Sequence, residues 1–377
     1  MKNIQNNRST TCFDDKHWVR DLNVKVLTGW WRLATRALEE AAGFKRSSEA
    51  IRPYMEHAGR AGYLVLKERM GWTDDSMTTV MTLSGAAHML LKKPINIVRV
   101  KGESEGYLEF DECPFEDASN LACVAICYDV IRGVANGANP DFYGDLLKTV
   151  KNGDDYCLKC VRNSKTSVTS NEEKWVDIMP DISSISDAEK DYFFCAYMGE
   201  FLIITIRAFN DLFGIDRTLE ILGPRFKEYG HEIGSEMKNE IPWPPGEIRL
   251  SEMLDLVRRG LMQETDPSVG KSNTQIEIKS CPFSGSPAPT CEIIESFLKG
   301  ISESIDPSIL FASDKKMRED KNTPCQWTFL SMEGKKDNVL QSEKGSDDPL
   351  RILQTRFAKG ELTKEEYSEM KRTLIDG

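Results

Sequence analysis

Six of the ten cysteines form two sets with the same spacing along the chain. Each set begins in a Cys-Pro-Phe tripeptide, has its second cysteine ten positions later, and has its third another 34 positions on. A thiolate attacks electrophilic carbon and binds soft metal ions, whereas a thiol behaves as a small buried hydrophobe. The spacing therefore predicts a nucleophilic site, a zinc site or core packing for two sets: Cys113, Cys123, Cys157 and Cys281, Cys291, Cys325.

The residues around each cysteine predict the element that positions it. The first cysteine follows an alternating, strand-like run, as in LEFDECPF from Leu108 and IEIKSCPF from Ile276. The second opens an amphipathic helix, in which apolar residues recur at three- and four-residue intervals. The third begins another strand, since Cys325, Trp327 and Phe329 alternate onto one face. The chain therefore combines helices with antiparallel strands, which predicts an α+β fold.

A thiol in the first turn of a helix lies near the positive end of the helix dipole, which favours the thiolate. We therefore expect the three cysteines of each set to converge around one pocket or metal ion. The candidate zinc ligands are Cys123, Cys157, Cys291 and Cys325. Cys157 and Cys160 also form C-x-x-C, but their side chains would face opposite sides of a strand, which disfavours a redox motif.

Two Arg/Glu pairs and one histidine are further candidates. Arg46 precedes Glu49, and Arg217 precedes Glu220, by three positions on a predicted helix, so each pair can form a surface ion pair. Alternatively, the planar guanidinium binds a substrate carboxylate. His231 is a candidate base in the second set only, because Arg60 stands at the matching position of the first.

The chain contains an internal duplication. The cysteine sets are related by a shift of 168 positions, and GFKRSSEAIRPYMEHAG from Gly43 matches GIDRTLEILGPRFKEYG from Gly214 at a shift of 171. We expect two copies of one helix-plus-antiparallel-sheet module, followed by a C-terminal α-helical hairpin. The expected boundaries are a first module at 21–163, a linker at 164–191, a second module at 192–332, a linker at 333–347 and the hairpin at 348–377.

Composition indicates a cytosolic protein. The net charge of −11 at pH 7 disfavours nucleic acid and anionic membranes as partners, because these attract clustered lysine and arginine. The first twelve residues, MKNIQNNRSTTC, lack the apolar run of a secretory signal. The cysteines of a cytosolic protein are expected to be reduced thiols or metal ligands.

The modules resemble two related families. The C-P-F motif, the helical cysteine and the final cysteine, with the preceding Gly/Arg/Glu/Pro helices, are similar to the L-2-amino-thiazoline-4-carboxylic acid hydrolase family. The segment from Cys291 through Gly300 to Cys325-Gln-Trp-Thr-Phe329 also resembles the vinyl-reductase-type small-molecule-binding domain. Lys and acidic residues around Lys315–Asp320 stand where that domain has its middle cysteine.

The tail resembles the short C-terminal oligomerisation hairpin (SHOCT-like) found on many bacterial and archaeal proteins. Pro349 stands at a predicted helix start and Gly360 at its end, and Thr363 and Glu366 form a capping box. Two helices this short need a partner surface to bury their apolar stripe, so a homo-oligomer is expected.

The resemblances imply a small-molecule hydrolase acting on a small heterocyclic or amidine-like substrate through cysteines, with zinc as the candidate cofactor. A non-catalytic small-molecule-binding or sensing protein of the vinyl-reductase type is the alternative. The third possibility is a scaffold protein whose two modules have lost their activity and whose tail drives assembly.

Overall fold

The computed structural model describes residues 16–113, 115, 117–165, 174–240, 264–269, 273–281, 283, 286–307, 309–313 and 325–331. Contacts divide the chain into two units, Met1–Phe329 and Leu330–Gly377. The expected hairpin at 348–377 lies outside the described residues, as does the linker at 333–347. Everything below concerns the first unit and the strand that ends it.

The first half packs helices on an antiparallel sheet. The sheet has the strand order β3-β4-β2-β1-β5, with every pairing antiparallel. Its elements are α1 (Lys16–Ala42), α2 (Phe44–Arg69), α3 (Met77–Leu90), β1 (Ile97–Lys101), β2 (Glu105–Phe110), α4 (Asn120–Cys123), the π-turn η1 (Val124–Asp129), α5 (Val130–Ala138), β3 (Phe142–Lys148), the 3-10 turn η2 (Val150–Asn152), β4 (Cys157–Asn163) and β5 (Val176–Ile178).

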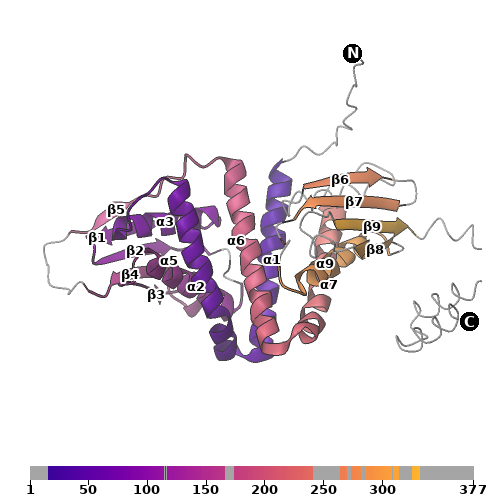
Figure 1. The fold of residues 1–377 in the computed structure, drawn as a ribbon, viewed down its shortest axis with the longest axis horizontal. Helices are drawn as coiled ribbons and strands as arrows, with labels where there is room; N and C mark the ends of the chain where they lie inside the picture. Colours follow the sequence, from indigo (N-terminus) through magenta and orange to yellow (C-terminus); the bar gives the residue numbers. More distant parts are fainter. Residues whose placement is uncertain are drawn as a thin grey trace, which may run out of the picture. The chain divides into compact units, whose positions relative to one another are not determined.

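The described elements of the second half are two long helices, two strands, a third helix and two further strands. Its sheet has the order β6-β7-β9-β8, which corresponds to β1-β2-β4-β3 of the first half (Figure 1). Its described elements are α6 (Asp187–Phe213), α7 (Ile215–Glu240), β6 (Glu264–Val269), β7 (Asn273–Ser280), α9 (Thr290–Ile305), β8 (Ile309–Ser313) and β9 (Cys325–Ser331). The fold is α+β, as the sequence predicts.

Two boundaries differ from the sequence-based expectation. Within 164–191, expected as a linker, β5 pairs with β1 and extends the first sheet. Helix α6 begins at Asp187, five positions before the expected module start, because Ser186 and Glu189 form a capping box there. Ser186 Oγ accepts from the backbone N–H of Glu189 at 3.3 Å, and the Glu189 carboxylate accepts from the N–H of Ser186 at 3.0 Å. Reciprocal capping of this kind satisfies two otherwise unpaired donors and fixes where a helix starts.

Helix α1 lies against α6 and joins the two halves (Figure 1). Its neighbouring tryptophans, both fully buried, pack against different aromatic side chains of one continuous core. Trp30 packs against aromatic rings of the second half, with ring centroids 4.9 Å from Phe297 and 6.0 Å from Phe226. Trp31 packs against Phe115 of the first half at 5.1 Å. Buried aromatic pairs of this size dominate core energetics, so the part of the core in each half depends on α1.

Reciprocal polar contacts tie α1 and α6 to the opposite halves. The Tyr54 hydroxyl on α2 donates to Asp211 at the end of α6 at 2.7 Å, and Arg225 on α7 pairs with Glu40 at the end of α1 at 2.7 Å. Tyr54 and Arg225 are 171 positions apart in the sequence, and so are Glu40 and Asp211. The same shift relates the sequence blocks that begin at Gly43 and Gly214.

Close glycine contacts set the crossing of two helix pairs. A Cβ on Gly59 of α2 would overlap the carbonyl of Val130, and one on Gly230 of α7 would overlap the carbonyl of Phe297. The facing helices carry Gly133 and Gly300, whose added Cβ would overlap the carbonyls of Glu56 and Lys227. Glycine is required at these positions because backbone atoms of the partner helix occupy the space of a side chain.

The π-turn accommodates one extra residue in the first half. Cys123 and Cys291 are 168 positions apart, whereas Gly133 and Gly300, which make equivalent helix contacts, are 167 apart. The difference falls at η1, Val124–Asp129, where a π-turn replaces the α-helical turn of α9. An insertion would otherwise rotate all following side chains by about 100° around the helix axis. π-turns of this kind are frequent at functional sites.

Two helical stretches have the length and hydropathy of membrane spans, Asn120–Ala138 and Asp187–Phe213. In their apolar windows, 56% and 67% of the residues are buried inside the protein, so most of these apolar side chains have packing partners within the chain.

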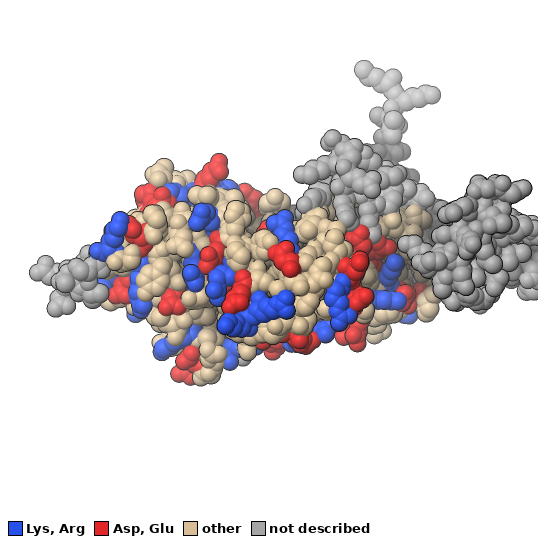
Figure 2. Space-filling view, turned by 60° about the horizontal axis from the view of Figure 1, so that its bottom comes forward, with Lys and Arg blue, Asp and Glu red and all other residues tan. Residues whose placement is uncertain are grey.

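Basic and acidic side chains are interspersed over the face drawn in Figure 2. The cytosolic location remains a prediction.

The helix crossing generates a matched stability test on α7. We expect Gly230→Ala to destabilise the fold by about 1–3 kcal/mol, because its Cβ requires the α7 and α9 backbones to separate. In the control Gly223→Ala, the new Cβ meets only the Ser296 hydroxyl at 3.6 Å, and better helix propensity should leave stability unchanged or slightly raised. Denaturant unfolding measures both variants; equal effects would contradict the close-crossing account.

Candidate functional site

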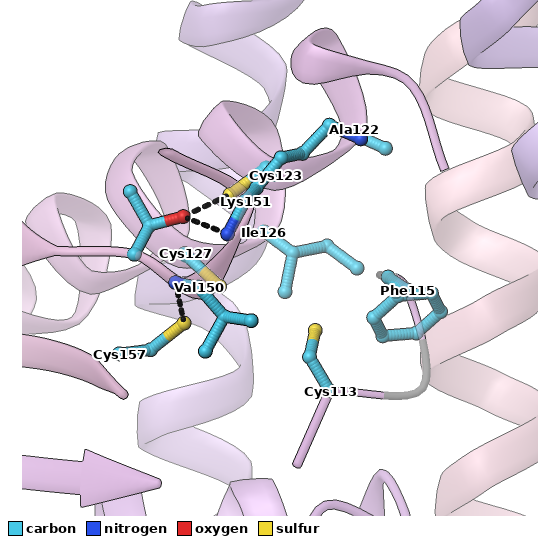
Figure 3. A pocket seen from close by; sticks show the side chains of 10 residues that line it. Cys113, Phe115, Ala122, Cys123, Ile126, Cys127, Val150, Lys151 and Cys157 are labelled. Atoms are coloured by element: carbon cyan, nitrogen blue, oxygen red, sulfur yellow. Dashed lines mark hydrogen bonds between the residues drawn. The ribbon is translucent and has the colours of Figure 1, made fainter. Parts of the chain in front are cut away.

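Four cysteines of the first half line one small enclosed space, which we call the thiol cluster: Cys113, Cys123, Cys127 and Cys157 (Figure 3). The first follows β2, the second ends α4, the third lies in the π-turn and the fourth begins β4. The space between them, walled by Phe115, Ile126 and Val150, has room for about one water molecule. The structure therefore brings the three repeated cysteines of this half together and adds a fourth, Cys127.

Polar neighbours orient the sulfurs. The backbone N–H of Val150 donates to Cys157 Sγ at 3.3 Å, and Cys123 Sγ lies 3.7 Å from the Thr149 hydroxyl (Figure 3). Cys123 also hydrogen-bonds to Cys127. Residues of both the π-turn η1 and the 3-10 turn η2 therefore line the thiol cluster.

Two buried lysines approach the cluster from beneath. Lys93 and Lys159 are each 1% exposed. Lys93 Nζ lies 3.8 Å from Cys127 Sγ, and Lys159 Nζ lies 2.8 Å from His88 Nε2. The ammonium groups also lie over aromatic rings, and Lys93 Nζ is 4.7 Å from the centre of the Phe115 ring. Buried ammonium groups require such partners, since an isolated one is costly to remove from water.

His88 is a neutral acceptor in this network. Its Nδ1 lies 2.7 Å from the carbonyl of Ser84, which can only accept, so Nδ1 donates and Nε2 accepts from Lys159. Burial holds the pKa of His88 well below its ordinary value, with the charges of Lys159 and Lys93 acting in the same direction. Burial also lowers the pKa of Lys159.

The thiols Cys123 and Cys127 act as a pair. The hydrogen bond from Cys123 and the nearby charges of Lys159 and Lys93 hold the pKa of Cys127 well below its ordinary value. The same hydrogen bond, together with burial, raises the pKa of Cys123. Of the two sulfurs, Cys127 is therefore the one on which a negative charge is favoured, and it lies beside the buried Lys93.

A groove of about 460 Å³ opens on the other side of Cys123. Cys123, Thr149 and Lys151 line both the groove and the thiol cluster. Its remaining wall residues are Phe44, Ser48, Arg52, Asn120, Val124, Tyr128, Leu146 and Asn152. The volume lies in the range of small-molecule sites, although polar and charged side chains make up more of its wall than is typical of such sites. Cys123 is thus the sulfur that connects the enclosed thiols with an accessible groove.

Arg52, on the groove wall, pairs with the buried Asp129 behind it. Arg52 Nε donates to Asp129 Oδ1 at 3.2 Å; the arginine side chain is 39% exposed and the aspartate fully buried. Asp129 Oδ2 has no hydrogen-bond partner in the described part of the chain. Burial raises the pKa of Asp129 to about 6, although Arg52 acts against this shift.

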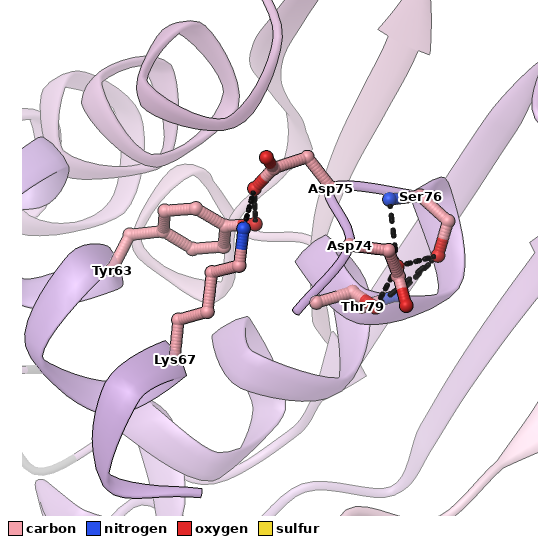
Figure 4. Close-up of polar contacts among 6 residues, drawn as sticks. All are labelled: Tyr63, Lys67, Asp74, Asp75, Ser76 and Thr79. Atoms are coloured by element: carbon pink, nitrogen blue, oxygen red, sulfur yellow. Dashed lines mark hydrogen bonds and ion pairs between the residues drawn. The ribbon is translucent and has the colours of Figure 1, made fainter. Parts of the chain in front are cut away.

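Polar contacts between α2 and α3 position the helix that carries His88 (Figure 4). Tyr63 and Lys67 of α2 both donate to Asp75 at 2.6 Å, just before α3. The neighbouring Asp74 accepts from Ser76 Oγ at 2.7 Å, and Ser76 Oγ in turn accepts from the Thr79 N–H as the helix cap. A capped first turn fixes the entry of α3 into the core.

The predicted arginine and glutamate residues lie away from the groove walls. Arg217 and Glu220 form an exposed ion pair at 2.7 Å, which is the surface alternative considered for them. Arg46 is exposed with its guanidinium 5.9 Å from the centre of the Phe213 ring, and Glu49 is exposed. The arginine that does line the groove is Arg52, on the same helix as Arg46.

His231, the candidate base of the second set, lies far from Cys291, the helical cysteine of that set. Its Nε2 lies 3.1 Å from Glu303, on the outside of the α7–α9 crossing. Glu303 follows Cys291 by twelve positions on α9, which corresponds to roughly 18 Å along the helix. The structure therefore does not bring His231 together with Cys291.

The second half keeps its cysteines, whereas two charged residues of the first half have uncharged counterparts in its sequence. Cys281, Cys291 and Cys325 are partly buried. At the shift that relates the cysteines, Lys159 corresponds to Trp327, which is buried and packs against Phe311. At the shift that relates α2 and α7, Arg52 corresponds to Gly223. No cysteine follows Cys291 within α9.

The donors do not fit the expected zinc site. Among the residues that the structure describes, no group of three or more His, Cys, Asp or Glu side chains is arranged to hold a metal ion. Tetrahedral zinc needs such a convergent set, and here Cys123 and Cys157 instead bond to protein groups. The zinc interpretation of Cys123, Cys157, Cys291 and Cys325 is therefore not supported.

Comparison with known proteins identifies the tail. Residues 348–375 match the family model described as a short C-terminal domain, SHOCT, as the residue pattern predicts. No curated protein and no solved structure matches the chain. The resemblance of the modules to thiazoline-carboxylate hydrolases remains a prediction from residue pattern.

Asp129 generates a test of pH dependence. Its folded-state pKa of about 6 exceeds the unfolded value of about 3.9, so its contribution is fully present below about pH 4 and is lost as the pH rises through 6. Relative to Asp129→Asn, the wild type should lose on the order of 2–3 kcal/mol of unfolding free energy between about pH 4 and pH 8. Denaturant titrations at several pH values measure the difference.

The exposed Asp155→Asn serves as the control for this experiment, since it should keep the pH profile of the wild type. Parallel pH profiles of Asp129→Asn and the wild type would show that the buried carboxylate does not carry the effect.

Proposed function

We propose that the chain contains two copies of one α+β module, of which the first carries a small-molecule site and the second a structural partner. The matching strand orders, the reciprocal Tyr54–Asp211 and Arg225–Glu40 contacts and the equivalent glycine crossings support the duplication. The loss of Lys159 and Arg52 equivalents at Trp327 and Gly223 supports the division of roles.

The function that the site supports best is thiol-dependent hydrolysis of a small heterocyclic or amidine-like molecule. The observation that carries this proposal is that one sulfur, Cys123, contacts both the groove and the charged thiol cluster. Nucleophilic attack requires the Cys123 proton to pass to Cys127, which leaves the negative charge on the groove-facing sulfur. Because the pKa of Cys123 is raised and that of Cys127 is lowered, this transfer costs free energy that binding of the substrate must offset. The resulting thiolate would attack the electrophilic carbon of a bound substrate.

The groove supplies groups that could orient such a substrate. Arg52 and Lys151 offer positive charge, and Asn120 and Asn152 offer amide donors and acceptors. Phe44 and Leu146 give an apolar wall for a ring. Water for the second, hydrolytic step can enter through the open side of the groove.

Non-catalytic binding or sensing of a small molecule is the second candidate. It is favoured by the enclosed thiols, whose shared space admits about one water and leaves little room for a reacting centre. In this case the ligand binds in the groove, and the thiol cluster is a packed structural element beneath the groove residues.

A matched cysteine experiment separates the two functions. With 2-amino-thiazoline-4-carboxylate as the probe, Cys123→Ser should lower kcat/KM at least about a hundredfold, whereas Cys291→Ser in the second half should keep wild-type activity. Ring opening releases a thiol and can be followed by proton NMR. Calorimetric binding without turnover in the wild type would favour the sensor, and equal turnover in Cys123→Ser would contradict a nucleophilic Cys123.

The tail is proposed to drive self-association. Residues 348–375 match the short C-terminal domain, and two short helices bury too little apolar surface alone. A chain ending at Gly345 should therefore have a lower oligomeric mass than the full chain. The full-length variant Leu353→Asp/Phe357→Asp should reproduce the loss, and light scattering after size exclusion measures all three. An unchanged mass in both variants would exclude the tail as the assembly element.

A further inference from the structure

Cys123 and Cys127 line the same small enclosed space of the thiol cluster (Figure 3). The two residues are four positions apart across the start of the π-turn and their thiols are hydrogen-bonded. Helical geometry places Cα atoms four residues apart at about 6 Å. That separation lies within the range of about 4.4–6.8 Å found in disulfides. The Cβ atoms of such residues are about 5–6 Å apart on a regular helix, compared with about 3.5–4.5 Å in a disulfide, so the bond requires a local shift of the backbone at the π-turn.

The surroundings favour attack by this pair on an oxidant. Lys93 Nζ lies 3.8 Å from Cys127 Sγ, and Lys159 Nζ lies 3.5 Å from the Ile126 carbonyl of the same turn. Two buried cations beside two thiols stabilise a thiolate, which is the form that oxidants modify. Cys123 reaches the groove, so a small molecule can contact the pair from solvent.

We propose that Cys123 and Cys127 form a redox pair that a hydroperoxide converts into a disulfide within the helix. This role is independent of the proposed hydrolysis, because it requires the second sulfur and the lysines but no substrate. Oxidation draws the Cys123 sulfur from the groove into the thiol cluster. A groove ligand or substrate then meets a sulfur that can no longer act as a nucleophile, so the pair regulates the site.

The chemistry balances with hydroperoxide as the oxidant. The proton of Cys123 passes to Cys127, and the Cys123 thiolate attacks one peroxide oxygen while the O–O bond breaks and the other oxygen leaves as hydroxide or alkoxide. The product is a sulfenic acid on Cys123. The Cys127 sulfur then attacks the sulfur of the sulfenic acid, the S–O bond breaks, and water leaves. Two thiols lose two electrons, and the peroxide is reduced to two water molecules or to water and an alcohol.

The second half provides an internal control. Cys291 stands at the position of Cys123, but Glu295 follows it by four positions and no cysteine follows within the helix. A disulfide of this type is therefore restricted to the first half.

The test uses the full-length reduced protein and hydrogen peroxide. After oxidation and alkylation with iodoacetamide, trypsin releases residues 102–132, which contain Cys113, Cys123 and Cys127. A second protease that cleaves after acidic residues separates Cys113 at Asp117 and releases residues 118–129 with only the pair. This peptide should be lighter by two hydrogens and carry no alkyl group, while the Cys291 peptide is alkylated as before treatment.

Variants test the mechanism. In Cys127→Ser, the reaction should stop at a Cys123 sulfenic acid, which a 1,3-dione probe traps. Lys159→Met keeps the volume of the side chain and should slow oxidation about tenfold. Lys148→Met, which removes a lysine paired with Tyr156 outside the thiol cluster, should not. Circular dichroism shows whether each lysine variant is folded. If Lys159→Met does not fold, the oxidation rate of Lys93→Met provides the test instead.

Three outcomes would overturn the proposal. They are a disulfide that includes Cys113 or Cys157 instead of the pair, oxidation of both cysteines beyond sulfenic acid without a disulfide, and wild-type oxidation rates in folded lysine variants. None of them bears on hydrolysis, which the Cys123→Ser and Cys291→Ser assay tests under reducing conditions.

Discussion

The first half is organised around two ammonium groups buried in an apolar core. Removing a charge from water costs several kcal/mol even after relaxation, so Lys93 and Lys159 can be buried only with partners in place. Cys127 Sγ accepts from Lys93, His88 supplies a neutral acceptor for Lys159, and the faces of Phe110 and Phe115 supply quadrupoles. Helix α3, β2, β4 and the π-turn must therefore keep their mutual positions, because each contributes one of these groups.

This constraint connects the fold to the candidate chemistry. Cys127, which lies beside Lys93, is hydrogen-bonded to Cys123, which contacts the groove. A structure that only needed stability could replace the charges by apolar residues of similar volume, as Trp327 does in the second half. The buried lysine of β4 in the first half, where the second half has Trp327, is the main physical reason for proposing the site in the first half.

The second half contributes through packing. Trp30 and Trp31 are neighbours on α1, yet they pack against different aromatic side chains, and Phe201 of α6 lies 5.9 Å from Trp31. Loss of either long helix would expose apolar surface in both halves. The groove residue Arg52 lies on α2, whose contacts with α6 include the Tyr54–Asp211 hydrogen bond. The position of the groove wall thus depends on a helix from the other half.

The sequence by itself determined the α+β class, the order of helices and strands around each cysteine, and the family of residues 348–375. These features depend on local periodicity and on fixed spacings, which a single chain displays. It also indicated that Cys113, Cys123 and Cys157 would meet, because strand ends and a helix start face one layer.

Only the tertiary structure decided which half carries the charged site and which residues complete it. Lys159 occupies an inward position of β4, between the buried Cys157 and Val161, but an isolated lysine in a strand is ordinarily expected to face solvent. Its partners His88 and Lys93 lie more than sixty positions away in sequence, so no local pattern links them. Cys127 joins the cluster through the π-turn, because the extra residue there changes which side chains face inward. Arg52, and not the predicted Arg46, lines the groove, because the packing of α2 against η1 and α5 sets which face of α2 is turned toward the groove.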